Sequence, residues 1–385
     1  MDNLAAKVQQ AVDTQRPEIV AFLKELVQIN TYSGNPEGIN RVGKMVASGM
    51  PARLSHRAVN DYKGVNHHIY TNQDSAGQPI VIVGHLDTVF PPDSEFQEFT
   101  ESEEKLFGPG TADMKGGIAV MVYALRILED FKILENIPLR CLINGDEETG
   151  SGSSYNLIRD LAQGAAYGLV FECGGLEGEV VKARRGIRRY KLSVSGKARH
   201  AGVKGGPKAS AVVEISQMVL ALEGLNDLEK DISINVGRIS GGTVTNMVPD
   251  HAVANFEFRF WNGEAEDEVI EKIKEIVKNP QNPECSAVIE CDHRRPAGCP
   301  VDGTDHIYKM VKTAAKELGQ KVGQESRGGT SDANFLIDEG IPTLDGMGPI
   351  GDMDHSPDEY ILRESLFERI ALTVVLLHKL SGAGG

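Results

Sequence analysis

The 385-residue sequence predicts an α/β domain into which a smaller α+β domain is inserted, and three observations support that fold class. Apolar strands alternate with helical segments in the first half of the chain, as in α/β domains. From about Val180 the strands alternate apolar and polar residues, which is typical of antiparallel sheets with one solvated face. After residue 294 the first pattern returns. Residues 1–179 and 295–385 are therefore expected to form one discontinuous domain around residues 180–294.

The first domain is expected to begin with a helix, because apolar residues from Ile19 to Val27 recur at three- and four-residue spacing. Strands follow in PIVIVGHLDTVF, IPLRCLINGDEETGSG and AYGLVFECGG, and the glycine-rich LFGPGTADMKGG leads into an apolar helix, GIAVMVYALRIL. Each strand ends in polar or acidic residues. Ligands of open α/β sheets bind beyond the carboxyl ends of the strands, so these polar residues mark the expected site.

The inserted domain is expected to contain alternating strands in RRYKLSVSGK, ISINVGRISG and AVANFEFRF, and a closing strand in SAVIECDH. Helices are expected at Ala209–Leu225 and Glu264–Lys278. Two helices on a small antiparallel sheet make a compact α+β unit. A helix at Asp305–Leu318 and a strand–loop–helix pattern up to residue 380 then complete the first domain.

Charge and composition exclude several classes of partner. Forty basic and 55 acidic side chains give a net charge of −15, which repels nucleic acid and anionic membrane surfaces. No window reaches the roughly 18 apolar residues of a membrane span. The five cysteines are dispersed without C-x-x-C spacing, and the N-terminal run lacks the pattern of a signal peptide. We therefore expect a cytoplasmic protein, with a signal peptide removed before this sequence begins as the open alternative.

Metal-type ligands follow the expected strands. His85 lies two residues before Asp87, a spacing at which a carboxylate can receive the ring N–H of a ligating histidine. Asp113 lies in a glycine-rich loop that can wrap closely around an ion. Glu147 and Glu148 are adjacent, so one can bind metal while the other holds a proton. Each motif alone is more often structural, but their occurrence in this order on strands of one sheet indicates a metal site.

In these segments the chain resembles the M20 family of metallopeptidases and amidohydrolases. The matching runs are GHLDTV, GPGTADMKGG, EETGS, FECGG and DHSPDEY. The resemblance implies a zinc-exopeptidase-like catalytic domain with a mixed central sheet, and a ferredoxin-like inserted domain that serves as lid and dimerisation domain. It also implies a co-catalytic pair of zinc ions per subunit, for which cobalt or manganese could substitute.

The resemblance assigns roles to single residues. His85 and Glu172 would bind one ion, Glu148 and His355 would bind the other, and Asp113 would bridge the two.

Two further catalytic roles follow from the same resemblance. Asp87 would orient the first histidine, and Glu147 would be the general base. The Asp113–Met114 peptide bond is expected to be cis. In this family a glutamate at the position of Glu172 accompanies carboxypeptidases and deacylases, whereas an aspartate accompanies aminopeptidases and dipeptidases.

The inserted domain and its return segment supply candidate substrate residues. His200, in KARHAG, resembles the histidine that family dimers present to the neighbouring active site, where it stabilises the oxyanion. Asn246, in GGTVTNMVPD, and Gly329, in GGTSDAN, resemble substrate-contacting positions. Arg259, in FEFRF, and Arg295, in HRRPA, are candidate anchors for substrate carboxylates. Taken alone, several of these are ordinary surface residues.

We therefore expect a dizinc hydrolase that cleaves an amide bond next to a free carboxylate, as a carboxypeptidase releasing C-terminal glutamate or a similar amino acid from small peptides. The alternative is an N-acyl-amino-acid deacylase of the acetylornithine deacetylase or desuccinylase type, which would use the same centre. A remote alternative is a catalytically silent relative that binds metabolites, although Glu147 and all five ligands are present. A homodimer through residues 180–294 is expected, because His200 in trans requires one.

Overall fold

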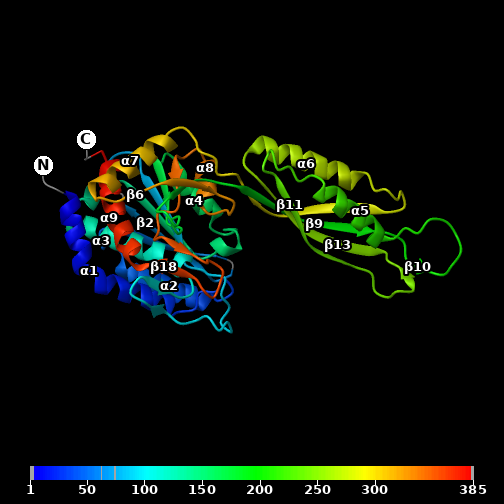
Figure 1. The fold of residues 1–385 in the computed structure, drawn as a ribbon, viewed down its shortest axis with the longest axis horizontal. Helices are drawn as coiled ribbons and strands as arrows, with labels where there is room; N and C mark the ends of the chain where they lie inside the picture. The colour runs from blue at the N-terminus through cyan, green and yellow to red at the C-terminus, as the bar shows by residue number, and fades with distance from the viewer. Residues whose placement is uncertain (1–3, 62, 73–74, 383–385) are drawn as a thin grey trace. The chain divides into compact units, whose positions relative to one another are not determined.

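The structure, a computed structural model, describes residues 4–61, 63–72 and 75–382 and forms two compact units (Figure 1). Unit 1 comprises the chain up to Ala183, Pro300–Arg327 and the chain from Ser331 on, and unit 2 comprises Arg184–Cys299 and Gly328–Thr330. These boundaries lie a few residues beyond the expected 180 and 294. The reason is that β8 (Val180–Arg184) pairs with β15 (Gln324–Arg327), whereas β14 of unit 2 runs on to Arg295.

The central sheet of unit 1 is mixed, in the order β1-β2-β6-β3-β7-β16, which confirms the predicted α/β class. Its strands are β1 (Ser55–Asn60), β2 (Asn66–Asn72), β3 (Ile80–His85), β6 (Leu139–Asn144), β7 (Tyr167–Val170) and β16 (Thr343–Leu344). The last four run parallel, and β1 and β2 are antiparallel. The carboxyl ends of β3, β6 and β7 therefore meet at one end of the sheet.

Helices cover both faces of this sheet. One face packs against α1 (Leu4–Val27), α2 (Pro36–Gly49), α3 (Gly116–Asp130), α7 (Thr304–Glu317) and α9 (Arg363–Leu380), and the other against α4 (Tyr155–Ala162) and α8 (Ala333–Asp338). Along β3, Ile80 and Ile82 belong to the first core cluster, whereas Val81 and Val83 belong to the second. A strand with both faces covered is buried at every position, which explains its continuous apolar run.

A second, antiparallel sheet in unit 1 brings two distant loops together. Its order is β17-β18-β5-β4, with β4 (Thr100–Glu101), β5 (Lys105–Phe107), β17 (Gly351–Asp352) and β18 (Tyr360–Leu362). The chain after β5 enters the short helical turn η1 (Thr111–Lys115) and then α3. The chain between β17 and β18 carries His355. The pairing of β5 with β18 therefore places both segments at the same end of the unit.

Unit 2 is an antiparallel sheet in the order β11-β13-β9-β14, with two helices on one face. The strands are β9 (Gly186–Ser195), β11 (Ser233–Gly241), β13 (His251–Phe260) and β14 (Ser286–Arg295), and the helices are α5 (Ala211–Glu223) and α6 (Gly263–Lys278). Burial alternates along β13, because its even-numbered residues pack against both helices. A short ribbon pairs β10 (Arg199–His200) with β12 (Met247–Val248).

Two further observations bear on the expected cellular context. Within the described ranges, no helix combines the length and the apolar character that crossing a membrane requires. All five cysteines of the sequence lie in described segments and are free thiols. A cytoplasmic location stays a prediction.

Gly117 allows α3 to approach the end of β7. A Cβ atom at this position would lie 1.9 Å from the carbonyl oxygen of Phe171, next to Glu172. We expect Gly117→Ala to lower the free energy of unfolding by about 1–3 kcal/mol, because one segment must shift. Urea denaturation measures the loss. Gly263→Ala is the matched control, since nothing lies within 4 Å of a Cβ atom there; an equal loss in both variants would contradict the close approach.

Candidate metal centre

Two groups of metal-type ligands lie beyond the strand ends of unit 1, and they share one residue. The first group is His85, Asp113 and Glu172, and the second is Asp113, Glu148 and His355. In each group, one ligand atom per residue lies within 4.8 Å of the others. The five residues predicted as ligands are therefore brought together from five separate segments of the chain.

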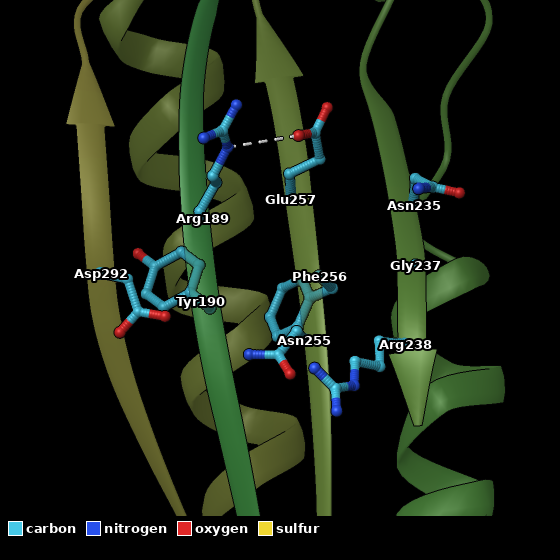
Figure 2. A pocket seen from close by; sticks show the side chains of 9 residues that line it. All are labelled: Arg189, Tyr190, Asn235, Gly237, Arg238, Asn255, Phe256, Glu257 and Asp292. Carbon is cyan, nitrogen blue, oxygen red and sulfur yellow. Dashed lines mark ion pairs between the residues drawn. The ribbon is translucent and has the colours of Figure 1, made fainter. Parts of the chain in front are cut away.

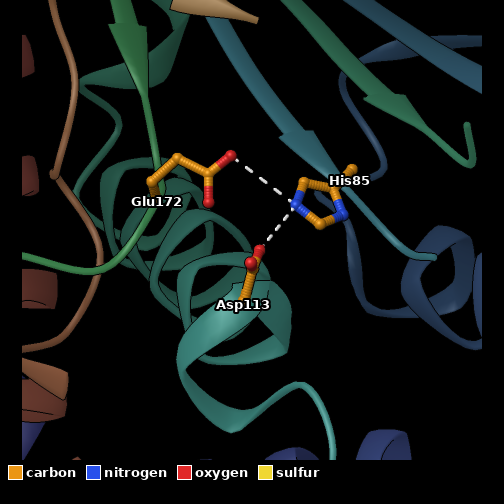
Figure 3. A group of neighbouring side chains, drawn as sticks. All are labelled: His85, Asp113 and Glu172. Carbon is orange, nitrogen blue, oxygen red and sulfur yellow. Dashed lines mark hydrogen bonds and ion pairs between the residues drawn. The ribbon is translucent and has the colours of Figure 1, made fainter. Parts of the chain in front are cut away.

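The first group is the more deeply buried (Figure 3). His85 ends β3, and its Nε2 atom lies 2.9 Å from Asp113 Oδ1 and 3.6 Å from Glu172 Oε1. Glu172 follows β7, and Asp113 lies in η1, where its peptide bond to Met114 is cis as expected. Figure 3 shows both carboxylates directed at one nitrogen of the imidazole ring.

The second group uses the other oxygen of Asp113. His355 Nε2 lies 3.3 Å from Asp113 Oδ2 and 3.2 Å from Glu148 Oε2. Asp113 thus presents Oδ1 to His85 and Oδ2 to His355, which is the arrangement of a bridging carboxylate. The His355 side chain is 53% exposed, so the second group is the more accessible to solvent.

The electrostatics of these groups favour bound cations. Burial, followed by the charge of Asp113, raises the pKa of Glu148 and of Glu172 to about 8. Hydrogen bonds to Asp113 and Glu148 raise the pKa of His355 to about 11. Burial alone would raise the pKa of Asp113, but hydrogen bonds from both histidines hold it below its usual range. Without metal, protons taken up by Glu148, Glu172 and His355 would offset the repulsion among the acids.

One buried atom supports a bound cation at the second ligand group. Glu148 Oε1 is shielded from solvent and has no hydrogen-bond partner among the described residues. An unpaired buried carboxylate oxygen is costly unless an ion or a donor satisfies it. The two histidine nitrogens and the carboxylate oxygens form a donor set that suits zinc, and also cobalt or manganese. The side chains present therefore fit a pair of divalent cations.

Asp87 contacts both His85 and the acidic loop. His85 Nδ1 lies 3.0 Å from the backbone oxygen of Asp87 and 3.5 Å from its Oδ1 atom, so the backbone is the nearer orienting partner. The Asp87 carboxylate accepts hydrogen bonds from the backbone N–H groups of Glu147 and Glu148, at 3.1 and 3.2 Å, and from the Ser33 hydroxyl at 2.9 Å. This fully buried carboxylate therefore also fixes the loop that carries the two glutamates.

Two other buried acids hold the same loop and were missed by the sequence reasoning. Asp146 accepts hydrogen bonds from the hydroxyls of Ser153 and Ser154, both at 2.6 Å, and Asp332 accepts one from the Ser151 hydroxyl at 2.5 Å. An acid followed by a serine-rich loop is a weak signal of such a network. For Asp332, which is distant in sequence, no local pattern could have revealed the contact.

The predicted substrate residues of unit 2 fall into two places. His200 and Asn246 are exposed and neighbouring, since the N–H of Ala201 donates to the Asn246 carbonyl at 2.8 Å. Arg259 donates to the carbonyl of Gly328, next to Gly329, at 2.8 Å.

Arg295 lies at the end of β14, in the same cross-strand row as Arg259, because both residues pair with Ile187 of β9, but only 1% of its surface is exposed. In this conformation it is enclosed by protein, and a substrate carboxylate would reach it only after a rearrangement. Its role as a second anchor stays a prediction, and Arg259 is the stronger candidate.

A hollow of about 290 Å³ lies on the sheet of unit 2 (Figure 2). Its polar lining carries both signs of charge, including an ion pair between Arg189 and Glu257 at 3.6 Å. The nine residues that line it include none of the predicted site residues. We assign it no part in the metal centre.

The metal-free protein should lose stability as the pH rises from about 4.5 to about 11, most steeply between about 6.5 and about 8, where all three groups contribute. Folding raises the pKa of Glu148 and Glu172 from 4.5 to about 8, and that of His355 from 6.5 to about 11. A group whose pKa is raised by folding stabilises the folded state below its unfolded pKa, and this contribution is lost as the pH rises through the folded pKa. Denaturant titrations of chelator-treated protein across this range measure the decline.

The zinc-loaded protein is the control for that measurement. Bound metal requires deprotonated ligands, so the decline should disappear or reverse when zinc is present. A metal-free protein that gained stability over the same range would contradict the assignment of these shifts.

Comparison with known proteins places this geometry in a family. The model of peptidase family M20/M25/M40 matches residues 81–379. Carboxypeptidase G2 of Pseudomonas sp. (strain RS-16) is 28% identical, over 97% of this chain and 92% of that protein. Acetylornithine deacetylase of Edwardsiella ictaluri is 24% identical, over 95% of this chain and 99% of that protein. The crystal structure of aminopeptidase PepT from Bacillus cereus superposes with a TM-score of 0.75 at 25% identity, covering 95% of this chain and 98% of that one.

The family match extends over most of the chain, from β3 to α9, and the two sequence relatives extend over nearly all of it. The predicted M20 resemblance is thereby confirmed. The chain therefore belongs to peptidase family M20/M25/M40, as a metallohydrolase of the carboxypeptidase or deacylase type.

Proposed function

We propose that the chain is a dizinc carboxypeptidase that releases C-terminal glutamate or a similar amino acid from small peptides. The observation that carries the proposal is the shared Asp113, whose two oxygens face two different ligand groups. Bound zinc ions would polarise the scissile carbonyl and lower the pKa of the attacking water. The side chains that would hold them are His85, Asp113, Glu148, Glu172 and His355.

Glu147 is the proposed general base. It is adjacent to Glu148 in the turn η3 (Glu147–Thr149), and the Asp87 carboxylate holds its backbone N–H. The Glu147 carboxylate would accept a proton from the attacking water and return it to the leaving nitrogen as the amide bond breaks. Hydrogen bonds from the loop backbone to Asp87 fix the turn from which this side chain would reach the attacking water.

Arg259 is the proposed anchor for the substrate carboxylate. Its side chain is 30% exposed, and it is held by Glu257 at 2.9 Å and by the Gly328 carbonyl at 2.8 Å. A planar guanidinium fixed in this way can pair with a carboxylate through two parallel hydrogen bonds. The similarity to carboxypeptidase G2 supports the peptidase reading.

A deacylase is the second candidate. The similarity to acetylornithine deacetylase, over 99% of that protein, favours an N-acyl amino acid as substrate. Both reactions cleave an amide bond next to an amino acid carboxylate, and both would use the same ligands and the same base. The two reactions differ in the group on the carbonyl side of the bond, which is a peptidyl residue for the carboxypeptidase and a simple acyl group for the deacylase.

Glu147→Gln should lower kcat by roughly 100- to 10,000-fold while zinc binding is retained, because the proton acceptor is lost and the ligands stay. The assay measures amino acid release from peptidyl and N-acyl derivatives of glutamate, aspartate, ornithine and leucine. Release of glutamate from peptides supports the carboxypeptidase, and a preference for acetyl or succinyl amino acids supports the deacylase.

Glu103→Gln is the control for this variant, because it removes the same charge at an exposed position. Full activity of Glu147→Gln would overturn the assignment of the base. No turnover of any substrate by the wild type with zinc, cobalt or manganese would favour the catalytically silent relative.

We further propose a homodimer through unit 2. Strand β11 is an edge of the sheet, and α5 packs against it. Three apolar side chains on these two elements are exposed: Val213 at 57%, Leu220 at 74% and Ile239 at 50%. An open strand edge beside an apolar helix face suits a two-fold interface with a second copy of the chain. His200 would then serve the centre of the partner subunit.

Mixing two inactive variants tests the dimer and His200 together. If His200 acts in trans, Glu147→Gln and His200→Ala subunits should restore about a quarter of the wild-type activity when mixed, because half the dimers then contain one complete site. Leu220→Glu should convert the dimer to a monomer in light scattering, whereas Val288→Glu on the opposite edge strand should not. A fully active monomer would refute the trans role.

A further inference from the structure

Glu359 is a buried acid that the proposed mechanism does not use. Its side chain has no exposed surface. Its carboxylate accepts three backbone hydrogen bonds: Oε2 from the N–H of Gly110 at 3.1 Å, and Oε1 from those of Ala112 at 2.7 Å and Asp113 at 3.0 Å. One side chain therefore binds the whole turn that ends at the shared carboxylate.

The turn itself explains why an acid is needed. Gly110 has a left-handed backbone, with φ of 81°, and the helical turn η1 begins after it. The backbone N–H groups at such a start have no partner within the turn and gather around one point, which attracts a negative charge. Glu359 supplies that charge from a segment 246 to 249 positions later in the chain.

The backbone of Glu359 belongs to the loop that carries His355. It directly precedes β18, which pairs with β5 just before the Asp113 turn. Its N–H donates to the Ser356 carbonyl at 3.2 Å, and its own carbonyl accepts from Gly108 at 3.4 Å. Glu359 is thus bonded on one side to the Asp113 turn and on the other to the residue that follows His355.

We propose that Glu359 is the positioning residue that sets Asp113 against His355, and so prepares the second ligand group for its ion. The inference rests on the proposed metal centre. Glu359 is not itself proposed as a metal ligand, because both of its carboxylate oxygens accept hydrogen bonds from backbone N–H groups. Its effect is to hold Asp113 Oδ2 and His355 Nε2 at their separation of 3.3 Å.

Glu359→Gln is the direct test. The glutamine amide replaces one carboxylate oxygen by an NH₂ group, so at least one of the three N–H groups faces a donor and loses its partner. Outer-shell changes of this kind typically weaken metal binding by roughly 10- to 100-fold, and we expect a loss of that size for one of the two zinc ions. Zinc affinity is measured by competition with a chelator on metal-free protein, and melting temperature is measured with and without zinc.

Asp358→Asn is the matched control, because it removes one negative charge from the neighbouring, exposed position. It should bind zinc as the wild type does. The zinc-induced rise in melting temperature should be smaller in Glu359→Gln than in the control, and excess zinc should restore its turnover. If Glu359→Gln does not fold, Glu359→Asp takes its place, since it keeps the charge but is too short to reach all three N–H groups.

The outcomes separate this inference from the proposed function. A wild type that binds no zinc overturns the metal centre and the inference with it. A wild type that binds two zinc ions, together with a folded Glu359→Gln that binds both equally tightly, overturns the positioning role alone. Turnover that stays low at saturating zinc also overturns it, because a pure positioning defect is corrected once the ion is bound.

Discussion

Repulsion among buried carboxylates is the constraint on which the rest of this site depends. Asp113, Glu148 and Glu172 are brought within a few ångströms of two histidines, in surroundings where an unpaired charge is costly. Nothing in their mutual interaction holds these acids together. The surrounding fold must supply the force that keeps them in place, and cations or protons must supply the charge that makes the arrangement tolerable.

The fold meets this requirement with charged side chains placed behind the ligand segments. Asp87 accepts hydrogen bonds from backbone N–H groups of the acidic loop, and Glu359 accepts them from backbone N–H groups of the Asp113 turn. Behind Glu172, the guanidinium of Arg327 donates instead to the carbonyl of Cys173 at 2.9 Å. Acidic side chains thus accept hydrogen bonds from the segments that present backbone N–H groups. An arginine donates to the segment that presents a backbone carbonyl. The ligands are positioned through their backbones, so their side chains stay available.

Much of this architecture could be predicted from local patterns. The helices of unit 2 were predicted to within two residues of their observed bounds. His85 and Glu172 could be expected at one place, since parallel strands end together. The roles of Asp332 and Glu359 could not be foreseen, because an acid looks the same in sequence whether it is solvated or buried. The burial of Arg295 could not be predicted either. The alternation of apolar and polar residues indicates which face of a strand a side chain lies on, but not which part of the protein covers that face.

The insertion of unit 2 has a consequence for the order in which the protein is made. Helix α9 (Arg363–Leu380) packs against α1 and α3 in the core of unit 1, yet the ribosome synthesises it after all of Arg184–Cys299. The main sheet and both helices of unit 2 are therefore synthesised before α9, the last helix that packs against α1 and α3 of unit 1. Unit 2 can therefore fold during translation, while the apolar faces of α1 and α3 wait for the end of the chain.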